Sequence, residues 1–317
     1  MQTYDFEPMS IGRILDTTFR IYRDNFIRFI TIVAIIQIPL GLFSIVSLSL
    51  VRSSVPVIQK NSSQQVTFNN LQNRGNSSTL AVQGSSQNTQ TVKINPTTAL
   101  IGGIAVIISS ILSLLGQLLC RGALTKSVSE VYLGNELSVN QAYKFVLPKF
   151  LTLILASIMV GLVTAMGFVL LIVPGVIFSL WFAFTTPAIV IENLKATEGM
   201  TRSKNLASGN LGKIFSVSFL VLLIAIVISM VINGPVSIVG RIALAANPVL
   251  HTVVTQSVSL AAQIIMIPIG SIAFILLYYD LRIRKEGFDL EMLANNIGSE
   301  QGGINVDQPN QPDNSEI

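Results

Sequence analysis

The chain has 317 residues, of which 50% are hydrophobic and only 11% are charged, and its formal net charge is +4. Soluble domains carry about 25% charged residues. In this chain charged residues are missing from long continuous stretches, which excludes a soluble globular protein. The basic residues stand at the ends of apolar segments rather than on a polar face, which argues against a nucleic-acid partner. Cys120 is the single cysteine, so an intramolecular disulfide and a cysteine-based metal cluster are excluded.

Residues 1–28 form the first predicted unit, an N-terminal amphipathic helix that begins after Pro8 and Ser10. Apolar side chains recur at helical spacing along 9–27, and arginines and aspartates take the other side. Such a helix can lie among the lipid headgroups with its apolar face toward the bilayer. It can equally pack that face on the cytoplasmic ends of its own protein, and the sequence favours neither arrangement.

Residues 29–293 form a predicted membrane domain of six spans, because about 20 apolar residues cross a bilayer core as a helix. We expect Pro39 to kink the first span and Pro174-Gly175 to make the turn between the third and the fourth. The uncharged run 150–191 leaves one alternative open, a single span with a re-entrant half in place of two full spans. The expected spans are about 29–51, 98–120, 151–172, 176–191, 214–235 and 256–279.

The remaining segments are polar. Residues 52–95 are rich in Ser, Asn and Gln and are predicted to be a long, flexible extracytoplasmic loop. Short amphipathic helices are expected at 139–150 and 197–208, and residues 294–317 are predicted to be a disordered acidic tail. The expected fold class is therefore an all-α integral membrane protein with cytoplasmic amphipathic helices and a long polar extracytoplasmic loop.

Six spans place both termini on one side of the membrane. The segments expected on that side hold 15 of the 20 Lys and Arg residues, and the other side holds 5. By the positive-inside rule both termini are predicted to be cytoplasmic. The predicted location is the plasma membrane, which is the inner membrane in a Gram-negative cell.

Catalytic chemistry finds little support in the sequence. No Asp, Glu, Lys or Arg falls near the middle of an expected span, and the lone histidine, His251, has no neighbouring acid or cysteine. We therefore predict a protein that is not an enzyme, with no catalytic residue, metal ligand or cofactor. The polar side chains inside spans are predicted to form hydrogen bonds between helices, with a polar substrate path as the alternative. They are Gln37, Gln117, Asn233 and Gln263.

Several segments together resemble a family of uncharacterised bacterial and archaeal membrane proteins, named for the membrane domain attached to some glycerophosphoryl diester phosphodiesterases. They look like that family's opening amphipathic helix, hairpin turn, cytoplasmic Arg-Ser helix and closing signature. The segments are 11–26, 171–175, 188–192, 200–209 and 277–290. The resemblance spans about 8–293 and implies a membrane domain without phosphodiesterase activity. That activity belongs to a separate soluble barrel, which needs histidines and about 250 residues.

Three functions remain in competition. The first is a non-catalytic protein that binds or organises the lipid bilayer, anionic headgroups or a membrane protein partner. A basic collar of Arg20, Arg23, Arg202 and Arg284 would contact anionic headgroups, unless these residues only anchor the protein. The second is a transporter or permease subunit, which the Pro- and Gly-interrupted spans favour and the absence of central charges opposes. The third is a membrane enzyme, for which no catalyst can be named.

Overall fold

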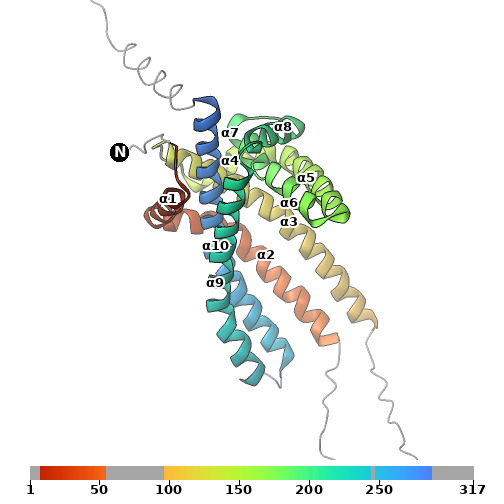
Figure 1. Ribbon diagram of the computed structural model, residues 1–317. Helices are drawn as coiled ribbons and strands as arrows, with labels where there is room; N and C mark the ends of the chain where they lie inside the picture. The colour runs from red at the N-terminus through yellow and green to blue at the C-terminus, as the bar shows by residue number, and fades with distance from the viewer. Residues whose placement is uncertain (1–7, 55–95, 244–246, 288–317) are drawn as a thin grey trace, which may run out of the picture.

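The computed structural model describes residues 8–54, 96–243 and 247–287, and every regular element within these ranges is a helix (Figure 1). The predicted loop 52–95, apart from its first residues, and the acidic tail 294–317 lie outside the described residues. Six helical segments are long and apolar enough to cross a membrane, so the expected all-α multi-pass fold is confirmed. They are Phe26–Arg52, Leu100–Tyr132, Val139–Leu170, Ile172–Glu192, Leu211–Gly240 and Val249–Glu286.

Four long helices form a bundle, and α10 packs on each of the other three (Figure 1). Their apolar side chains face both the bundle interior and the outside, as expected where lipid replaces water. Small residues bring the helices close together. A Cβ at Gly116 would collide with Leu40, and a Cβ at Gly41 would collide with Leu260. The helices are α2 (Phe26–Ser54), α3 (Pro96–Tyr132), α9 (Leu211–Ala243) and α10 (Pro248–Glu286).

These helices continue beyond the apolar windows that predict them. The sequence analysis ended the fifth span at Pro235, but α9 continues through Pro235 to Ala243. Likewise α10 begins at Pro248, so His251 lies in a helix instead of a loop. Apolar composition reports the hydrocarbon core only, whereas backbone hydrogen bonding extends a helix into the headgroup region.

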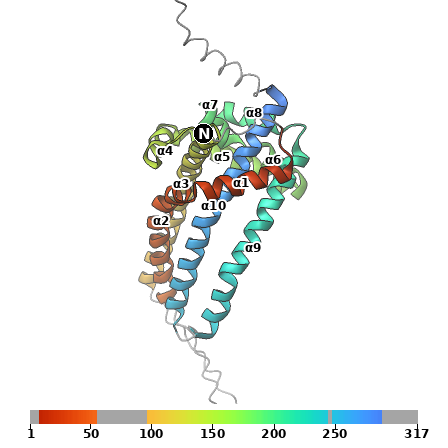
Figure 2. The same cartoon turned by 90° about the vertical axis from the view of Figure 1, so that its left-hand side faces the viewer.

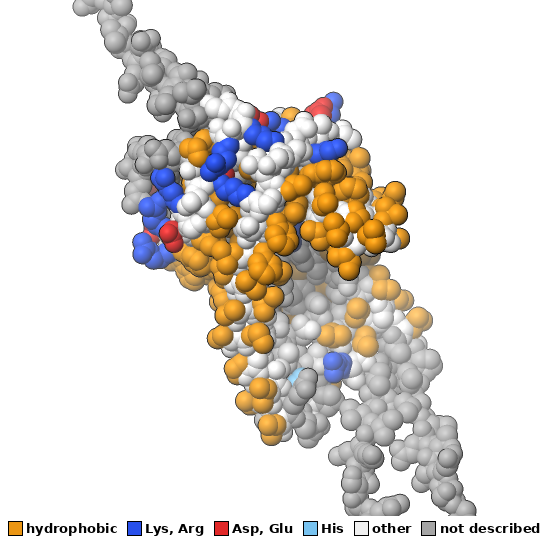
Figure 3. Space-filling model, viewed as in Figure 1, with side chains coloured by type: hydrophobic (Ala, Val, Ile, Leu, Met, Phe, Trp, Pro, Cys, Tyr) orange, Lys and Arg blue, Asp and Glu red, His pale blue; other side chains and the backbone are white. Residues whose placement is uncertain are grey.

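The short helices gather at one end of the bundle, where α2 begins and α10 ends (Figure 1). This charged end carries α1 (Ile11–Asp24), α4 (Val139–Val146), a 3₁₀ turn (Leu147–Lys149), α7 (Thr185–Glu192) and α8 (Ala196–Ala207). Most of the Lys and Arg side chains in view lie there, and the flanks are apolar (Figure 3).

Helix α1 lies across α10 at the charged end (Figure 2). Ser10 caps it, because its hydroxyl accepts a hydrogen bond from the Arg13 N–H. Its apolar face, with Ile14 and Ile21, is buried against the bundle. Of the two arrangements open for this helix, the structure has the one that packs on its own protein.

A hairpin of α5 (Phe150–Leu170) and α6 (Ile172–Trp181) lies beside the bundle near the charged end. Its turn is at Leu171, whose backbone is extended, so the prediction of a turn at Pro174-Gly175 is wrong. Pro174 instead lies in the first turn of α6, where a missing N–H costs nothing. The predicted fourth span is also divided, because α6 ends at Trp181 and α7 begins only at Thr185.

Candidate functional site

Two adjoining hollows, both partly open to the surface, lie between α2, α3, α7 and α10. The smaller, of about 110 Å³, is lined mainly by polar side chains of α2, α3 and α10. The larger, of about 350 Å³, lies between α3, α10 and the start of α7. Arg121 and Ile267 line both. We call these two hollows together the Arg121 cavity.

Three of the four predicted intramembrane polar residues line the smaller hollow. They come from three different helices: Gln37 from α2, Gln117 from α3 and Gln263 from α10. Gln37 is only 6% exposed, and its Nε2 has no hydrogen-bond partner among the described residues. A buried amide without a partner is costly, so this donor is available to a ligand.

Asn233 lies elsewhere, on α9. Its Oδ1 accepts a hydrogen bond from Ser259 Oγ of α10 at 2.9 Å, and its Nδ2 donates to the Ser229 carbonyl at 3.1 Å. This side chain joins two helices, the role expected for polar residues in lipid-embedded bundles.

Arg121 is the functional candidate that the sequence analysis missed. The predicted second span ends at residue 120, and α3 continues to Tyr132, so Arg121 lies within the helix, about 16 Å before its end at 1.5 Å per residue, with an exposed side chain. None of the described residues forms an ion pair or hydrogen bond with its guanidinium. One signal was available in the sequence: Gln117 precedes it by one helical turn and so shares its face.

The Arg121 cavity therefore offers a fixed positive charge and amide donors, and no carboxylate lines it. Guanidinium groups bind phosphate and carboxylate groups through paired hydrogen bonds. Apolar side chains, which include Phe274, line the same hollow beside these polar groups. The site is chemically suited to an anionic group attached to an apolar body.

The four arginines of the predicted collar are placed differently from one another. Arg20 and Arg23 lie on the exposed face of α1, and Arg23 pairs with Asp24 at 3.1 Å. Arg202 and Arg284 instead bind carboxylates of this protein. Arg284 contacts Asp280 at 3.1 Å.

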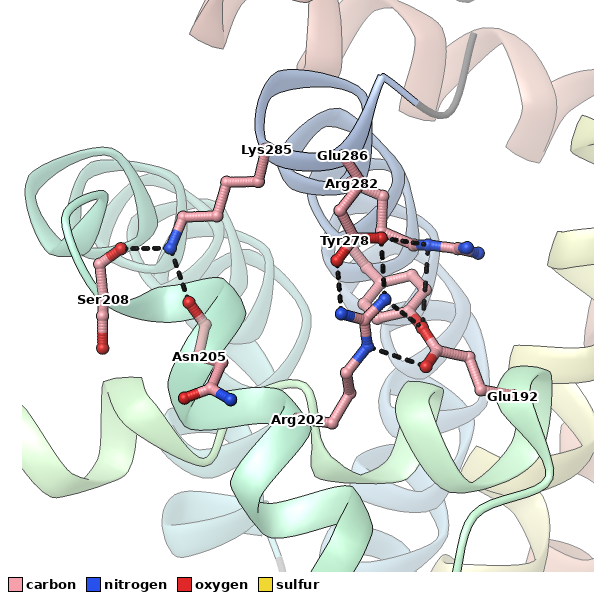
Figure 4. A network of polar contacts seen from close by, with 8 residues as sticks. All are labelled: Glu192, Arg202, Asn205, Ser208, Tyr278, Arg282, Lys285 and Glu286. Carbon is pink, nitrogen blue, oxygen red and sulfur yellow. Dashed lines mark hydrogen bonds and ion pairs between the residues drawn. The ribbon is translucent and has the colours of Figure 1, made fainter. Parts of the chain in front are cut away.

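Arg202 is the centre of a network that joins α7, α8 and α10 (Figure 4). Its guanidinium donates to Glu192 at 2.7 Å and to Glu286 at 2.7 Å. The Tyr278 hydroxyl also donates to Glu192. The hydrogen bond to Glu286, together with the one to Glu192, raises the pKa of Arg202 above its ordinary value, so this side chain stays charged.

Asp280 forms a second network and is fully buried. It accepts a hydrogen bond from the Met9 N–H at 2.7 Å and pairs with Lys213 and Arg284. The segment before α1 is thereby tied to α9 and α10. The described residues contain no group of His, Cys, Asp and Glu side chains that could hold a metal ion.

Comparison with known proteins agrees with a membrane location. A stretch of 94 residues, 30% of this chain, is 33% identical to a UPF0259 membrane protein of Wigglesworthia glossinidia brevipalpis. The matched stretch covers 35% of that relative, so this chain spans only about a third of the relative's length. No solved structure matches the chain.

The family comparison covers the Arg121 cavity and most of the two networks, whose residues Arg284 and Glu286 lie beyond the match. Neither match is to the glycerophosphoryl diester phosphodiesterase membrane domain, so that resemblance was right only in indicating an uncharacterised membrane protein family. The family model described as a domain of unknown function, DUF7847, matches residues 9–281, and the chain therefore belongs to this family.

Proposed function

We propose that this protein is a non-catalytic, multi-pass membrane protein that binds an anionic lipid in the Arg121 cavity. The observation that carries the proposal is Arg121 itself, an arginine that lines both hollows and has no counter-charge among the described residues. Charged groups next to apolar spans normally pair with one another or mark the path of a ligand. The unpartnered Gln37 amide beside it points to the same conclusion.

The lining of the larger hollow favours a lipid over a small soluble anion. Arg121, Thr125 and Thr186 supply polar groups, whereas Phe274 and Ile267 supply apolar walls. A volume of about 350 Å³ is at the lower end of small-molecule sites, so it would hold a headgroup while the acyl chains remain in the bilayer. The proposed ligand is thus a phosphate-bearing or carboxylate-bearing lipid.

The location and the other partners are part of the same proposal. With the charged end in the cytoplasm, the cavity lies in the cytoplasmic half of the plasma membrane, where anionic lipids attract basic residues. Arg20 and Arg23 would add a weaker, surface contact with headgroups, whereas Arg202 and Arg284 chiefly hold the fold together. A membrane protein partner could share this lipid, and no nucleic acid is expected. The resemblance to the phosphodiesterase membrane domain contributes no activity.

The proposal is tested by lipid retention. The wild-type protein, Arg121→Gln and Lys144→Gln are extracted in mild detergent and compared by native mass spectrometry, then titrated with phosphatidylglycerol. A hydrogen-bonded charge is worth about 1.5–3 kcal/mol, so Arg121→Gln should weaken binding by about tenfold or more. Lys144→Gln, a control at an exposed position of α4, should change it little. Equal lipid binding by all three proteins would overturn the proposal.

A transporter or permease subunit is the alternative, and the same cavity distinguishes it. If the polar residues form a substrate path, Gln37→Leu would abolish flux in proteoliposomes while bound lipid is retained. If the cavity holds a lipid, Gln37→Leu would weaken lipid binding, and proteoliposomes with the wild-type protein would already show no flux. A further titration with inorganic phosphate separates a lipid site from a simple anion site, because inorganic phosphate should not displace the lipid from a lipid site.

A further inference from the structure

The α5–α6 hairpin presents an apolar surface that the rest of the described chain leaves uncovered. Its side chains around the tip are highly exposed, with Val169 at 85% and Leu171 at 70%. No charged residue occurs anywhere from Phe150 to Ile191. Figure 3 shows this surface as a large apolar area beside the bundle. Such an area is not stable in water, so it must be covered by lipid or by protein.

The returning arm of the hairpin is interrupted, and its first helix, α6, is too short to cross a bilayer alone. Helix α6 has 10 residues, which is about 15 Å of helix against about 30 Å of hydrocarbon. After Trp181 the chain breaks, and α7 packs on α3 and α8 at the charged end. In both views the tip ends well short of the far ends of α2, α3, α9 and α10 (Figures 1 and 2).

The turn itself is suited to hydrocarbon instead of water. From Gly167 to Gly175 it has no polar side chain. Two backbone hydrogen bonds close it: the Leu171 N–H donates to the Gly167 carbonyl at 3.0 Å, and the Gly175 N–H donates to the Leu171 carbonyl at 3.3 Å. The two arms approach closely there, since a Cβ at Gly167 would lie 3.0 Å from Gly175 Cα. Such pairing reduces the number of backbone polar groups that the turn presents to lipid.

We infer that α5–α6 is a re-entrant hairpin, which enters the membrane from the charged end and stops within the hydrocarbon. The apolar surface of the hairpin is covered by the acyl chains of the leaflet at the charged end, which contact the tip wherever the rest of the protein does not. The chain would then cross the membrane fully four times, through α2, α3, α9 and α10. A hairpin of this kind returns to its own side, so the locations of the termini do not change. The inference does not depend on a ligand at Arg121.

The experiment uses single cysteines at three heights. Leu171→Cys reports the tip, Asn247→Cys the far end and Glu136→Cys the charged end, and all three positions are exposed. The wild-type chain is the blank, because its only cysteine, Cys120, is buried. Intact cells are treated with a membrane-impermeant maleimide, with and without permeabilisation. Retention of the folded protein in size-exclusion chromatography is required of each variant.

A re-entrant tip should escape the reagent on both sides. Asn247→Cys should react in intact cells, Glu136→Cys only after permeabilisation, and Leu171→Cys in neither condition. A spin label at Leu171 should be accessible to dissolved oxygen and shielded from a polar nickel reagent. Reaction of Leu171→Cys together with Asn247→Cys would show a full crossing and overturn the inference. Disulfide-linked dimers through Leu171→Cys would also overturn it, because a second copy would then cover the tip.

Discussion

Asp280 shows how one side chain fixes the end of this fold. Its carboxylate is fully buried, and three groups reach it: the Met9 N–H and Lys213 come from distant parts of the chain, and Arg284 comes from one turn further along α10. The Lys213 ammonium also donates to the Met9 carbonyl at 2.7 Å, so the charges and the backbone form a closed network. Because the partners arrive from α9, α10 and the start of α1, the carboxylate acts as a junction between them.

We expect Asp280→Asn to destabilise the protein by about 3 kcal/mol, since removing one charge of a buried pair leaves the other uncompensated. The measurement is the free energy of unfolding in detergent, together with the rate at which a protease removes the N-terminal segment. Asp24→Asn is the matched control. Its partner Arg23 is 80% exposed, so the pair contributes little. An equal effect of the two substitutions would contradict this account of Asp280.

Ser203 connects secondary-structure elements, because its side chain stabilises the break between helices α6 and α7. Its hydroxyl accepts a hydrogen bond from the Phe184 N–H at 3.0 Å and donates one to the Trp181 carbonyl at 2.7 Å. Both backbone groups are left over where one helix ends and the next begins. One buried hydroxyl from α8 therefore supplies hydrogen bonds to the backbone N–H and carbonyl groups at the break in an otherwise continuous apolar segment.

We predict that Ser203→Ala costs about 1–3 kcal/mol, because it leaves a buried donor and a buried acceptor unsatisfied. Ser208→Ala is the control, since that hydroxyl bonds only within its own helix and is exposed. Thermal unfolding of both variants in the same detergent gives the comparison. Should Ser203→Ala unfold like Ser208→Ala, another group must stabilise the break.

These two residues also show where sequence reasoning reached its limit. Long uncharged runs predicted the apolar helices, because length and apolar composition are sufficient to identify a segment that can cross a bilayer. The break at 182–184 lies within a uniformly apolar run, and its partner Ser203 comes from a helix formed later in the chain. Arg121 was missed for the opposite reason. A charge after an apolar run normally marks the membrane surface, whereas here α3 continues for several more turns.

The candidate site was predictable in part for the same physical reason. The polar residues Gln37, Gln117 and Gln263 stood out because amides in hydrocarbon need partners. That all three line one cavity depends on how α2, α3 and α10 are rotated about their axes and shifted along them relative to each other. The sequence of a single helix does not determine this arrangement. The collar was predicted from charge alone. The carboxylates that bind Arg202 come from other helices, whereas Asp280, which binds Arg284, lies one turn away on the same helix.

The whole molecule is polarised along its long axis, and this predicts its orientation. One end holds α1, α8 and the end of α10, where Lys and Arg side chains gather, and the opposite end holds the end of α9 and the start of α10 (Figures 1 and 3). Because basic residues are retained on the cytoplasmic side, the charged end should face the cytoplasm. The Arg121 cavity and the α5–α6 hairpin would then both lie in the cytoplasmic half of the membrane.

Reporter fusions after Leu211, after Asn247 and at the C-terminus test this orientation. Green fluorescent protein should fluoresce at the first and third positions, and alkaline phosphatase should be active only at the second. The result does not depend on whether the hairpin crosses, since either form returns the chain to the same side before α9 begins. Phosphatase activity at the C-terminus would mean that an odd number of segments cross. The charge asymmetry would then not determine the orientation, and a lipid at Arg121 would have to come from the other leaflet.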